Sequence, residues 1–171
     1  MNRRLHDFFT RDHRRLEALL EQAFADPGAI DHEAYGQFRA GLLRHIGMEE
    51  KILFVAAQEA NAGAPLPVQA KLRLDHGALT SLMVIPPSVA LTRVIRHVLD
   101  LHDDIEEKPG GMYDACEQLT EHRTDVLLER LAHVPETPVH PPNPSHKAIG
   151  AARRAMARAG FDYDLLGGPG E

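Results

Sequence analysis

The chain has 171 residues, 43% hydrophobic and 26% charged, which is typical of one domain with a sizeable core. Its formal charge of −6 argues against a nucleic-acid-binding surface, and no apolar run approaches the roughly 20 residues that span a bilayer. We therefore predict a protein that binds neither nucleic acid nor membrane.

Cysteine usage and the first residues bear on the cellular compartment. The single cysteine, Cys116, cannot form an internal disulfide, which fits a reducing environment. The first seven residues are basic but have neither the apolar segment nor the small-residue cleavage site of a signal peptide. We therefore expect a cytoplasmic protein.

Proline and glycine divide the sequence into segments with helical periodicity and no alternating strand pattern. The first segment spans about residues 3–25, and a turn at residues 26–28 separates it from a second that begins after Asp31, a good N-cap. A third begins near Pro67, and Ser88 can cap a fourth. Four long helices with short connections predict an all-α fold, an up-down-up-down four-helix bundle.

The end of the fourth helix is ambiguous in the sequence. Pro109 removes a backbone donor, so we expect a kink or local bulge before the helix resumes over residues 112–118, with a stop at this point as the alternative. Residues 120–133 predict a short fifth helix on their own apolar spacing.

A proline-rich segment separates the bundle from the tail. Residues 135–144 hold five of the chain's 12 prolines and predict an extended linker. Ser145 can then cap a short basic helix over residues 146–159. We divide the chain into a bundle, residues 1–134, and a linker with a basic helix and flexible tail, residues 135–171. The tail helix either packs back on the bundle or binds a protein partner.

A histidine is followed four residues later by a glutamate at two places, one in the second predicted helix and one in the fourth. On a helix the two side chains of each pair lie one turn apart on the same face. The first and third helices each place one further histidine on their apolar face. The six candidate metal ligands are His13, His45, Glu49, His76, His102 and Glu106.

Imidazoles and carboxylates together suit borderline metals such as Fe, Mn or Zn. Burying six such groups among apolar residues without a metal would cost several kcal/mol. One metal with six protein ligands would have no open position, whereas two metals that share bridging ligands would keep one. If both glutamates bridge, each metal has two histidines and two carboxylate oxygens.

The acidic residues beside these ligands are expected to be surface groups in helix ion pairs. His6 lies seven residues before His13 on the same face, and we expect it at the surface, with a hydrogen bond near the bundle mouth as the alternative. The acidic residues are Glu50, Asp75, Asp103, Asp104 and Glu107.

The ligand pattern resembles that of the haemerythrin-like, or HHE cation-binding, family of four-helix bundles, over residues 3–118. The family motif is a histidine in helices one and three and His-x-x-x-Glu in helices two and four, and the Asp-His pairs at Asp12 and Asp75 agree with it as well. The resemblance implies a non-haem di-iron centre, two Fe ions joined by bridging glutamates and an oxygen-derived bridge. The spacing alone also allows Mn or Zn.

The third helix departs from the oxygen-carrying haemerythrins, which have a second histidine one turn from the first. Here the corresponding positions are Leu72 and Thr80. The ligand set is therefore more similar to the version with four histidines and two glutamates in the repair-of-iron-centres proteins.

This resemblance and the ligand set predict a di-iron protein that binds O2, peroxide or nitric oxide at an open iron position, for sensing, scavenging or stress response. The pocket is expected to be lined by Leu42, Leu72, Leu79 and Val98. The alternative is a regulatory module in which metal occupancy sets the stability of the bundle and residues 135–171 contact a partner. Turnover with peroxide or nitric oxide would separate an enzyme from a binding module.

Overall fold

The structure is a computed structural model that describes residues 3–26 and 28–170, so Pro27 of the expected first turn lies outside the described residues. Within these ranges all regular structure is helical, which confirms the predicted all-α class. The elements in chain order are α1 (Arg4–Ala23), α2 (His32–Met48), the π-helix η1 (Glu49–Leu53), α3 (Phe54–Ala60), α4 (Gln69–Leu82), α5 (Val89–Glu107), α6 (Met112–Thr120), the 3-10 turn η2 (Glu121–Arg123), α7 (Thr124–Ala132) and α8 (His146–Ala159). None of these helices combines the length and apolar character needed to cross a bilayer.

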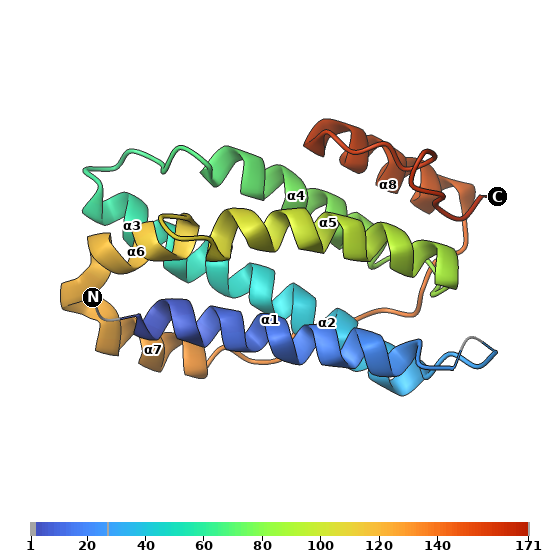
Figure 1. Ribbon diagram of the computed structural model, residues 1–171, viewed down its shortest axis with the longest axis horizontal. Coiled ribbons are helices and arrows are strands. Elements are labelled where there is room, and N and C mark those ends of the chain that lie inside the picture. The colour runs from blue at the N-terminus through green and yellow to red at the C-terminus, as the bar shows by residue number, and fades with distance from the viewer. Residues whose placement is uncertain (1–2, 27, 171) are drawn as a thin grey trace.

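Helices α1, α2, α4 and α5 lie along one another, and each runs opposite to the one before it (Figure 1). Helix α1 packs against both α2 and α5, and α4 packs against α5. Helices α6 and α7 lie at the end where α1 begins, whereas α8 lies along α4 (Figure 1). Helices α6 and α7 thus cover one end of the antiparallel helices α1, α2, α4 and α5, and α8 covers one side.

Side-chain caps fix three helix starts where the sequence predicts them. The Asp31 carboxylate accepts hydrogen bonds from the backbone N–H groups of Glu33 and Ala34. Ser88 caps α5, and Ser145 caps α8, each accepting a bond from the N–H three residues on. These caps satisfy backbone donors that have no partner within the helix.

The chain stops α5 at Glu107 and turns sharply before α6, so of the two alternatives at Pro109 the stop is correct. Gly110 has a φ of 74°. A Cβ on Gly111 would lie 2.6 Å from the carbonyl oxygen of Ile105, so only glycine fits the close approach of the two backbones. This turn sends α6 back against α1 and α5.

The predicted helix over residues 120–133 is wrong in its first part. Thr120 ends α6, the turn η2 follows, and α7 begins at Thr124. The hydroxyls of Thr120 and Thr124 donate to the carbonyl oxygens of Cys116 and Glu121. Such side-chain bonds to the backbone compete with a continuous helix.

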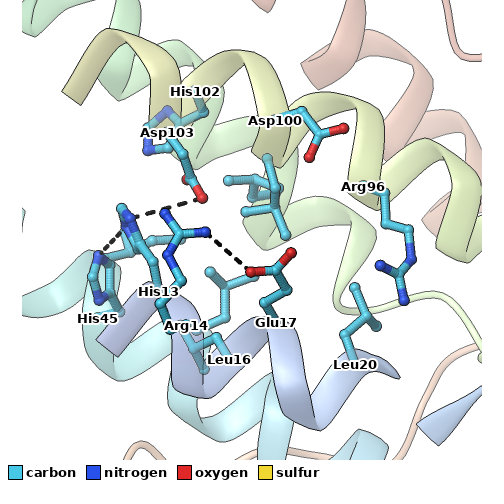
Figure 2. A pocket seen from close by; sticks show the side chains of 14 residues that line it. His13, Arg14, Leu16, Glu17, Leu20, His45, Arg96, Asp100, His102 and Asp103 are labelled. Carbon is cyan, nitrogen blue, oxygen red and sulfur yellow. Dashed lines mark hydrogen bonds and ion pairs between the residues drawn. The ribbon is translucent and has the colours of Figure 1, made fainter. Parts of the chain in front are cut away.

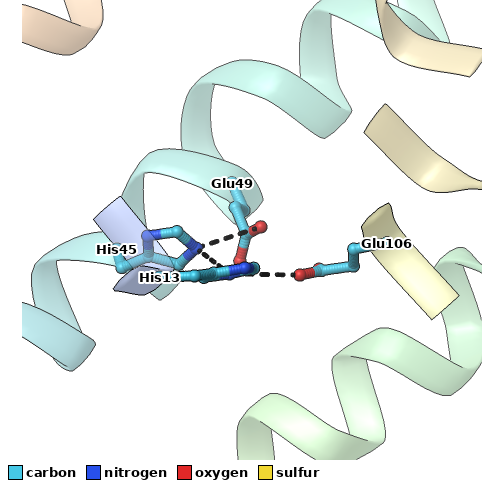
Figure 3. Close-up of side chains that lie close together, drawn as sticks. All are labelled: His13, His45, Glu49 and Glu106. Carbon is cyan, nitrogen blue, oxygen red and sulfur yellow. Dashed lines mark hydrogen bonds and ion pairs between the residues drawn. The ribbon is translucent and has the colours of Figure 1, made fainter. Parts of the chain in front are cut away.

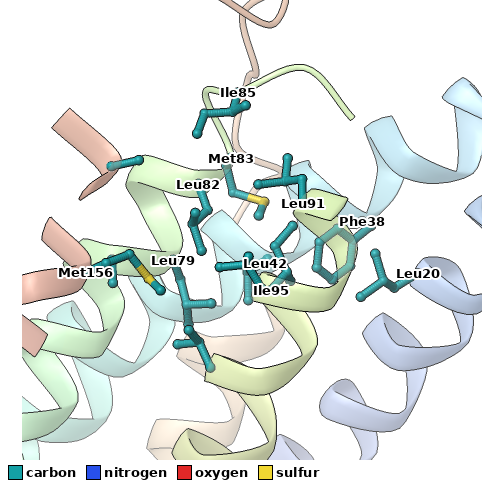
Figure 4. Close-up of a cluster of buried hydrophobic side chains, with 14 of the residues drawn as sticks. Leu20, Phe38, Leu42, Leu79, Leu82, Met83, Ile85, Leu91, Ile95 and Met156 are labelled. Atoms are coloured by element: carbon teal, nitrogen blue, oxygen red, sulfur yellow. The ribbon is translucent and has the colours of Figure 1, made fainter. Parts of the chain in front are cut away.

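Two apolar clusters fill the interior, one on each side of a layer of buried polar residues. The first, at the α8 end, includes Leu20, Phe38, Leu42, Leu79, Leu91, Ile95 and Met156 (Figure 4). The second, at the α6 and α7 end, includes Leu5, Phe9, Met48, Leu72, Met112 and Leu127. Close packing on both sides keeps the polar layer away from bulk solvent.

The tail packs back on the rest of the protein, which is one of the two predicted alternatives. Met156 of α8 joins the first apolar cluster. The Arg39 guanidinium donates to the carbonyl oxygens of Met83 (2.8 Å) and His140 (3.0 Å), and so fastens the proline-rich segment to the end of α4. A protein partner for residues 135–171 stays a prediction.

A glutamate from a distant helix caps α1. The buried Glu117 carboxylate accepts hydrogen bonds from the backbone N–H groups of Leu5 (2.7 Å) and His6 (3.0 Å), whereas the N-cap residue Arg3 provides no side-chain cap. Replacing Glu117 with alanine is therefore expected to lower the free energy of unfolding by about 1 to 2 kcal/mol. Urea unfolding would measure it, and an equal loss in a Glu129→Ala control, on the exposed face of α7, would contradict it.

Candidate metal centre

The six candidate ligands come together in the buried polar layer between the two apolar clusters. None is more than 6% exposed, and the two glutamates are fully buried. They form two groups that share both glutamates. The first group is His13, His45, Glu49 and Glu106, and the second group is Glu49, His76, His102 and Glu106.

The first group joins α1 and α2 to η1 and α5 (Figure 3). The Nε2 atoms of His13 and His45 are 2.9 Å apart. His45 Nε2 lies 3.4 Å from Oε1 of Glu49, and His13 Nε2 lies 3.5 Å from Oε2 of Glu106. Each imidazole of this group thus faces a glutamate oxygen with its Nε2 atom. His45 faces Oε1 of Glu49, and His13 faces Oε2 of Glu106.

The second group repeats this arrangement with the other oxygen of each glutamate. The Nε2 atoms of His76 and His102 are 3.2 Å apart. His76 Nε2 lies 3.1 Å from Oε2 of Glu49, and His102 Nε2 lies 3.2 Å from Oε1 of Glu106. Each glutamate therefore turns one oxygen toward each histidine pair.

These separations fit metal ions at the centre of each group. With metal–ligand bonds of about 2.1 Å, adjacent ligand atoms of an octahedral metal lie about 3.0 Å apart. Among the described residues, Oε2 of Glu49 and Oε1 of Glu106 accept no hydrogen bond of good geometry, although both are buried. Buried carboxylate oxygens that face imidazole nitrogens are satisfied by a cation. The buried histidine and glutamate groups can therefore hold metal ions.

A second set of carboxylates supports all four histidines through their other nitrogen. Each histidine donates its Nδ1 proton to an acidic residue on a neighbouring helix. The pairs are His45 with Asp12 (2.8 Å), His76 with Glu50 (2.7 Å), His102 with Asp75 (3.4 Å) and His13 with Glu107 (2.6 Å). We call these four acidic residues the carboxylate ring.

Each member of the carboxylate ring lies next in sequence to a candidate ligand. Its hydrogen bond, however, goes to a histidine on another helix, so the four bonds connect the helices in a closed circle. The pairs lead from α1 to α2, from η1 to α4, from α4 to α5 and from α5 back to α1. Metal-binding histidines usually donate their second ring N–H to a carboxylate, which fixes the tautomer and the ring orientation. In all four histidines the ring leaves Nε2 facing the metal groups.

The surroundings of three of the histidines, His45, His76 and His102, raise the pKa of the imidazole. Burial lowers the pKa of His45, but the charge of Glu49 and the hydrogen bond to Asp12 outweigh it and raise the pKa to about 10. Burial likewise raises the pKa of Glu49, yet His45 and His76 hold it well below its usual range. A metal bound here would have to displace these protons, so its binding is expected to strengthen as the pH rises.

Three members of the ring were expected to be only surface ion pairs, and for two of them, Glu50 and Glu107, this prediction is incomplete. Glu50 does pair with Arg73 (2.9 Å), and Glu107 pairs with Arg14 (2.6 Å). Each also accepts the Nδ1 proton of a buried histidine. A side chain at the boundary of a helix face reaches both solvent and the neighbouring helix.

Two other surface predictions are wrong. Asp75 is fully buried, where it accepts from His102 and pairs with Lys71. His6 is only 8% exposed, and its Nε2 lies within hydrogen-bond distance of the Arg3 guanidinium and of the backbone oxygen of Glu107 (3.2 Å), so the alternative of a hydrogen-bonded His6 is correct.

Asp103 and Asp104 divide between the interior and the surface. Asp104 is exposed, as predicted, whereas Asp103 is only partly exposed. Burial raises the pKa of Asp103 to about 6. Its carboxylate lies 3.7 Å from Nδ1 of His13.

The sequence contained a signal for the carboxylate ring. Asp-His occurs at Asp12 and again at Asp75, and Glu-Glu ends both His-x-x-x-Glu motifs, at Glu50 and Glu107. The repeat thus extends beyond the candidate metal ligands and includes every member of the ring. Two helical segments with the same order of residues, α1 to η1 and α4 to α5, supply the six candidate ligands and the carboxylate ring.

Two further features had no clear signal in the sequence. The π-helix η1 begins at Glu49, so the helix widens where a ligand and a ring member follow each other. Tyr113 of α6 reaches the layer, where its hydroxyl lies 2.6 Å from Oε1 of Glu49 and 2.8 Å from Oε2 of Glu106. Tyr113 has no counterpart in the repeat.

A cavity of about 60 Å³ leads to the histidines from the side of the first apolar cluster (Figure 2). That volume is enough for a few water molecules or a diatomic ligand. His13, His45 and His102 line its inner end. The other lining residues are Arg14, Leu16, Glu17, Leu20, Leu42, Ile46, Leu79, Arg96, Leu99, Asp100 and Asp103.

The predicted pocket is therefore correct for Leu42 and Leu79 but wrong for Leu72 and Val98. Leu72 packs in the second apolar cluster, and Val98 is fully buried in the first. Arg14 and Glu17, paired at 3.0 Å, lie at the exposed side of the cavity (Figure 2).

The chain was compared with protein families, curated proteins and solved structures. No family model, no curated protein and no solved structure matches it, so a function for this centre is inferred from its own geometry.

Proposed function

We propose that this protein is a haemerythrin-like di-iron protein, in which α1, α2, α4 and α5 form a four-helix bundle around two Fe ions. It binds O2, peroxide or nitric oxide at an open iron position, for sensing, scavenging or stress response. One observation carries the proposal: Glu49 and Glu106 each turn one oxygen toward each histidine pair. Two bridging carboxylates and two pairs of imidazoles are a ligand set for two borderline metals.

The protein's own residues bind and orient the centre and control access to it. The carboxylate ring holds the four imidazoles with Nε2 inward. Leu42 and Leu79 limit the water beside the histidines, and Arg14 and Glu17 flank the entry of a small ligand. When bound, the iron would supply open coordination positions and electrons.

Metal content and the response to small ligands test this proposal. Protein reconstituted with ferrous iron without air is expected to hold about two irons per chain, which two groups require. Its visible absorption should change when O2 is admitted, and again with peroxide or nitric oxide. A chelator should remove the iron and lower the melting temperature.

The alternative function is a regulatory module in which metal occupancy sets bundle stability. It is favoured by the way the two groups join all four long helices, so that metal loss loosens each of them. One zinc per chain, or bound iron that responds to none of the three ligands, would support this alternative and contradict the first proposal. We place the protein in the cytoplasm, and a partner for residues 135–171 belongs to the regulatory alternative.

A further inference from the structure

The hydroxyl of Tyr113 contacts one atom from every residue of the first group. Besides Glu49 Oε1 (2.6 Å) and Glu106 Oε2 (2.8 Å), it lies 3.1 Å from Nε2 of His13 and 3.3 Å from Nε2 of His45. These are the atoms that face the centre of that group. The phenol oxygen is thus a fifth donor atom directed at the same point.

The distances are those of a ligand atom. Adjacent ligand atoms around an octahedral metal lie about 3.0 Å apart, and the four separations from the Tyr113 oxygen range from 2.6 to 3.3 Å. The phenol oxygen lies within this range of all four atoms that the first group presents to its centre. A hydroxyl that served only one carboxylate would not need contact with both histidines.

The protein fixes this position from several sides. The turn through Gly110 and Gly111 brings α6 back against α5, which directs Tyr113 into the layer. Its ring stacks on Phe9, with centroids 5.1 Å apart, and its side chain is only 1% exposed. The oxygen therefore has little freedom to leave the group.

The second group has no such donor among the described residues. The oxygens that face it, Glu49 Oε2 and Glu106 Oε1, accept no hydrogen bond of good geometry there, whereas Tyr113 contacts the opposite oxygen of each glutamate. The aromatic side chain beside His76 is Phe54, which has no donor atom and stacks on the imidazole. Tyr113 thus breaks the two-fold repeat of the centre.

We propose that the phenol oxygen of Tyr113 is a further ligand, to the metal of the first group alone, so that the two metals are unlike. This inference rests on the proposed function, since it requires metal in both groups. Coordination replaces the phenol O–H bond by an oxygen–metal bond and releases the proton to solvent. The first metal then has five protein donor atoms and the second has four, so the metal held by His76 and His102 has one more position open to a small ligand.

Ferric iron is a direct probe, because a phenolate bound to it gives a charge-transfer absorption in the visible region and tyrosinate bands in resonance Raman spectra. The wild-type protein loaded with ferric iron is expected to show both signals. Tyr113→Phe should still hold two irons per chain, since all six other ligands remain, but should lose both signals. A Tyr35→Phe control, in the first apolar cluster, should keep them.

A second variant makes the test independent of how Tyr113→Phe folds. The chain has three tyrosines, so replacing Tyr35 and Tyr163 with phenylalanine leaves Tyr113 as the sole source of a phenolate. This double variant should keep the full signal. Two irons without the signal in the wild type, or the signal in Tyr113→Phe, would overturn the inference and leave the di-iron proposal standing. Wild-type protein that binds no metal would overturn both.

Discussion

Replacing Glu49 with alanine is expected to remove both metals at once, because its two oxygens face different histidine pairs. A terminal ligand would cost only one metal. Metal bound to the folded state stabilises it by about 4 kcal/mol when its concentration is 1,000 times Kd, and the variant should lose that amount. Metal content per chain and thermal unfolding with and without iron would measure the two effects.

The control for this experiment is Glu21→Ala, an exposed glutamate of α1. It should keep two metals and the full stabilisation by iron. Circular dichroism of the metal-free proteins would establish that the Glu49 variant still folds. A Glu49 variant that retains one metal would contradict the bridging assignment, and one that retains two would contradict any role of this carboxylate as a ligand.

Removing the charge of one ring member is expected to weaken metal binding about 10- to 100-fold without removing a ligand. Asp12→Asn should have the larger effect, because Asp12 accepts from His45 at 2.8 Å, whereas Asp75 accepts from His102 at 3.4 Å. The asparagine keeps the shape of the side chain but no longer stabilises a partial positive charge on the imidazole. Competition with a chromophoric chelator would measure the affinity.

Asp104→Asn is a matched control for Asp12→Asn and Asp75→Asn. Asp104 is exposed on α5 and lies two residues from His102. Its affinity for metal should equal that of the wild type. If the Asp12 and Asp75 variants bound metal as tightly as this control, the carboxylate ring would have no part in metal binding and would serve only to join the helices.

The helical spacing of apolar residues was sufficient to predict that the six candidate ligands lie in the interior. A histidine such as His13, spaced between Phe9 and Leu16 on one apolar stripe, must enter the interior when that stripe does. Caps such as Asp31 and Ser88 mark helix starts because their hydrogen bonds are local. Fold class and ligand positions follow from such short-range rules.

The ring and the tyrosine could not be derived in the same way. Whether Glu50 reaches His76 depends on how two helices are rotated against each other, which no single-helix pattern contains. Tyr113 depends on the turn at Pro109, where the sequence led us to expect a kink, with a stop as the alternative. The repeated Asp-His and Glu-Glu pairs were visible in the sequence, but helix geometry alone assigned Glu50, Asp75 and Glu107 to the surface.

The shared glutamates also have a consequence for biosynthesis. Glu106 belongs to both metal groups and follows the other five candidate ligands in the chain. While the ribosome is still making α5, the hairpin of α1 and α2 and the helix α4 are already available, yet neither group has its full set of donors. A chain that ends before Glu106 would complete neither group, and one that ends before Tyr113 of α6 would lack the further ligand that we propose for the first group. The proposed binding of both metals therefore requires that the ribosome has made α5 and α6.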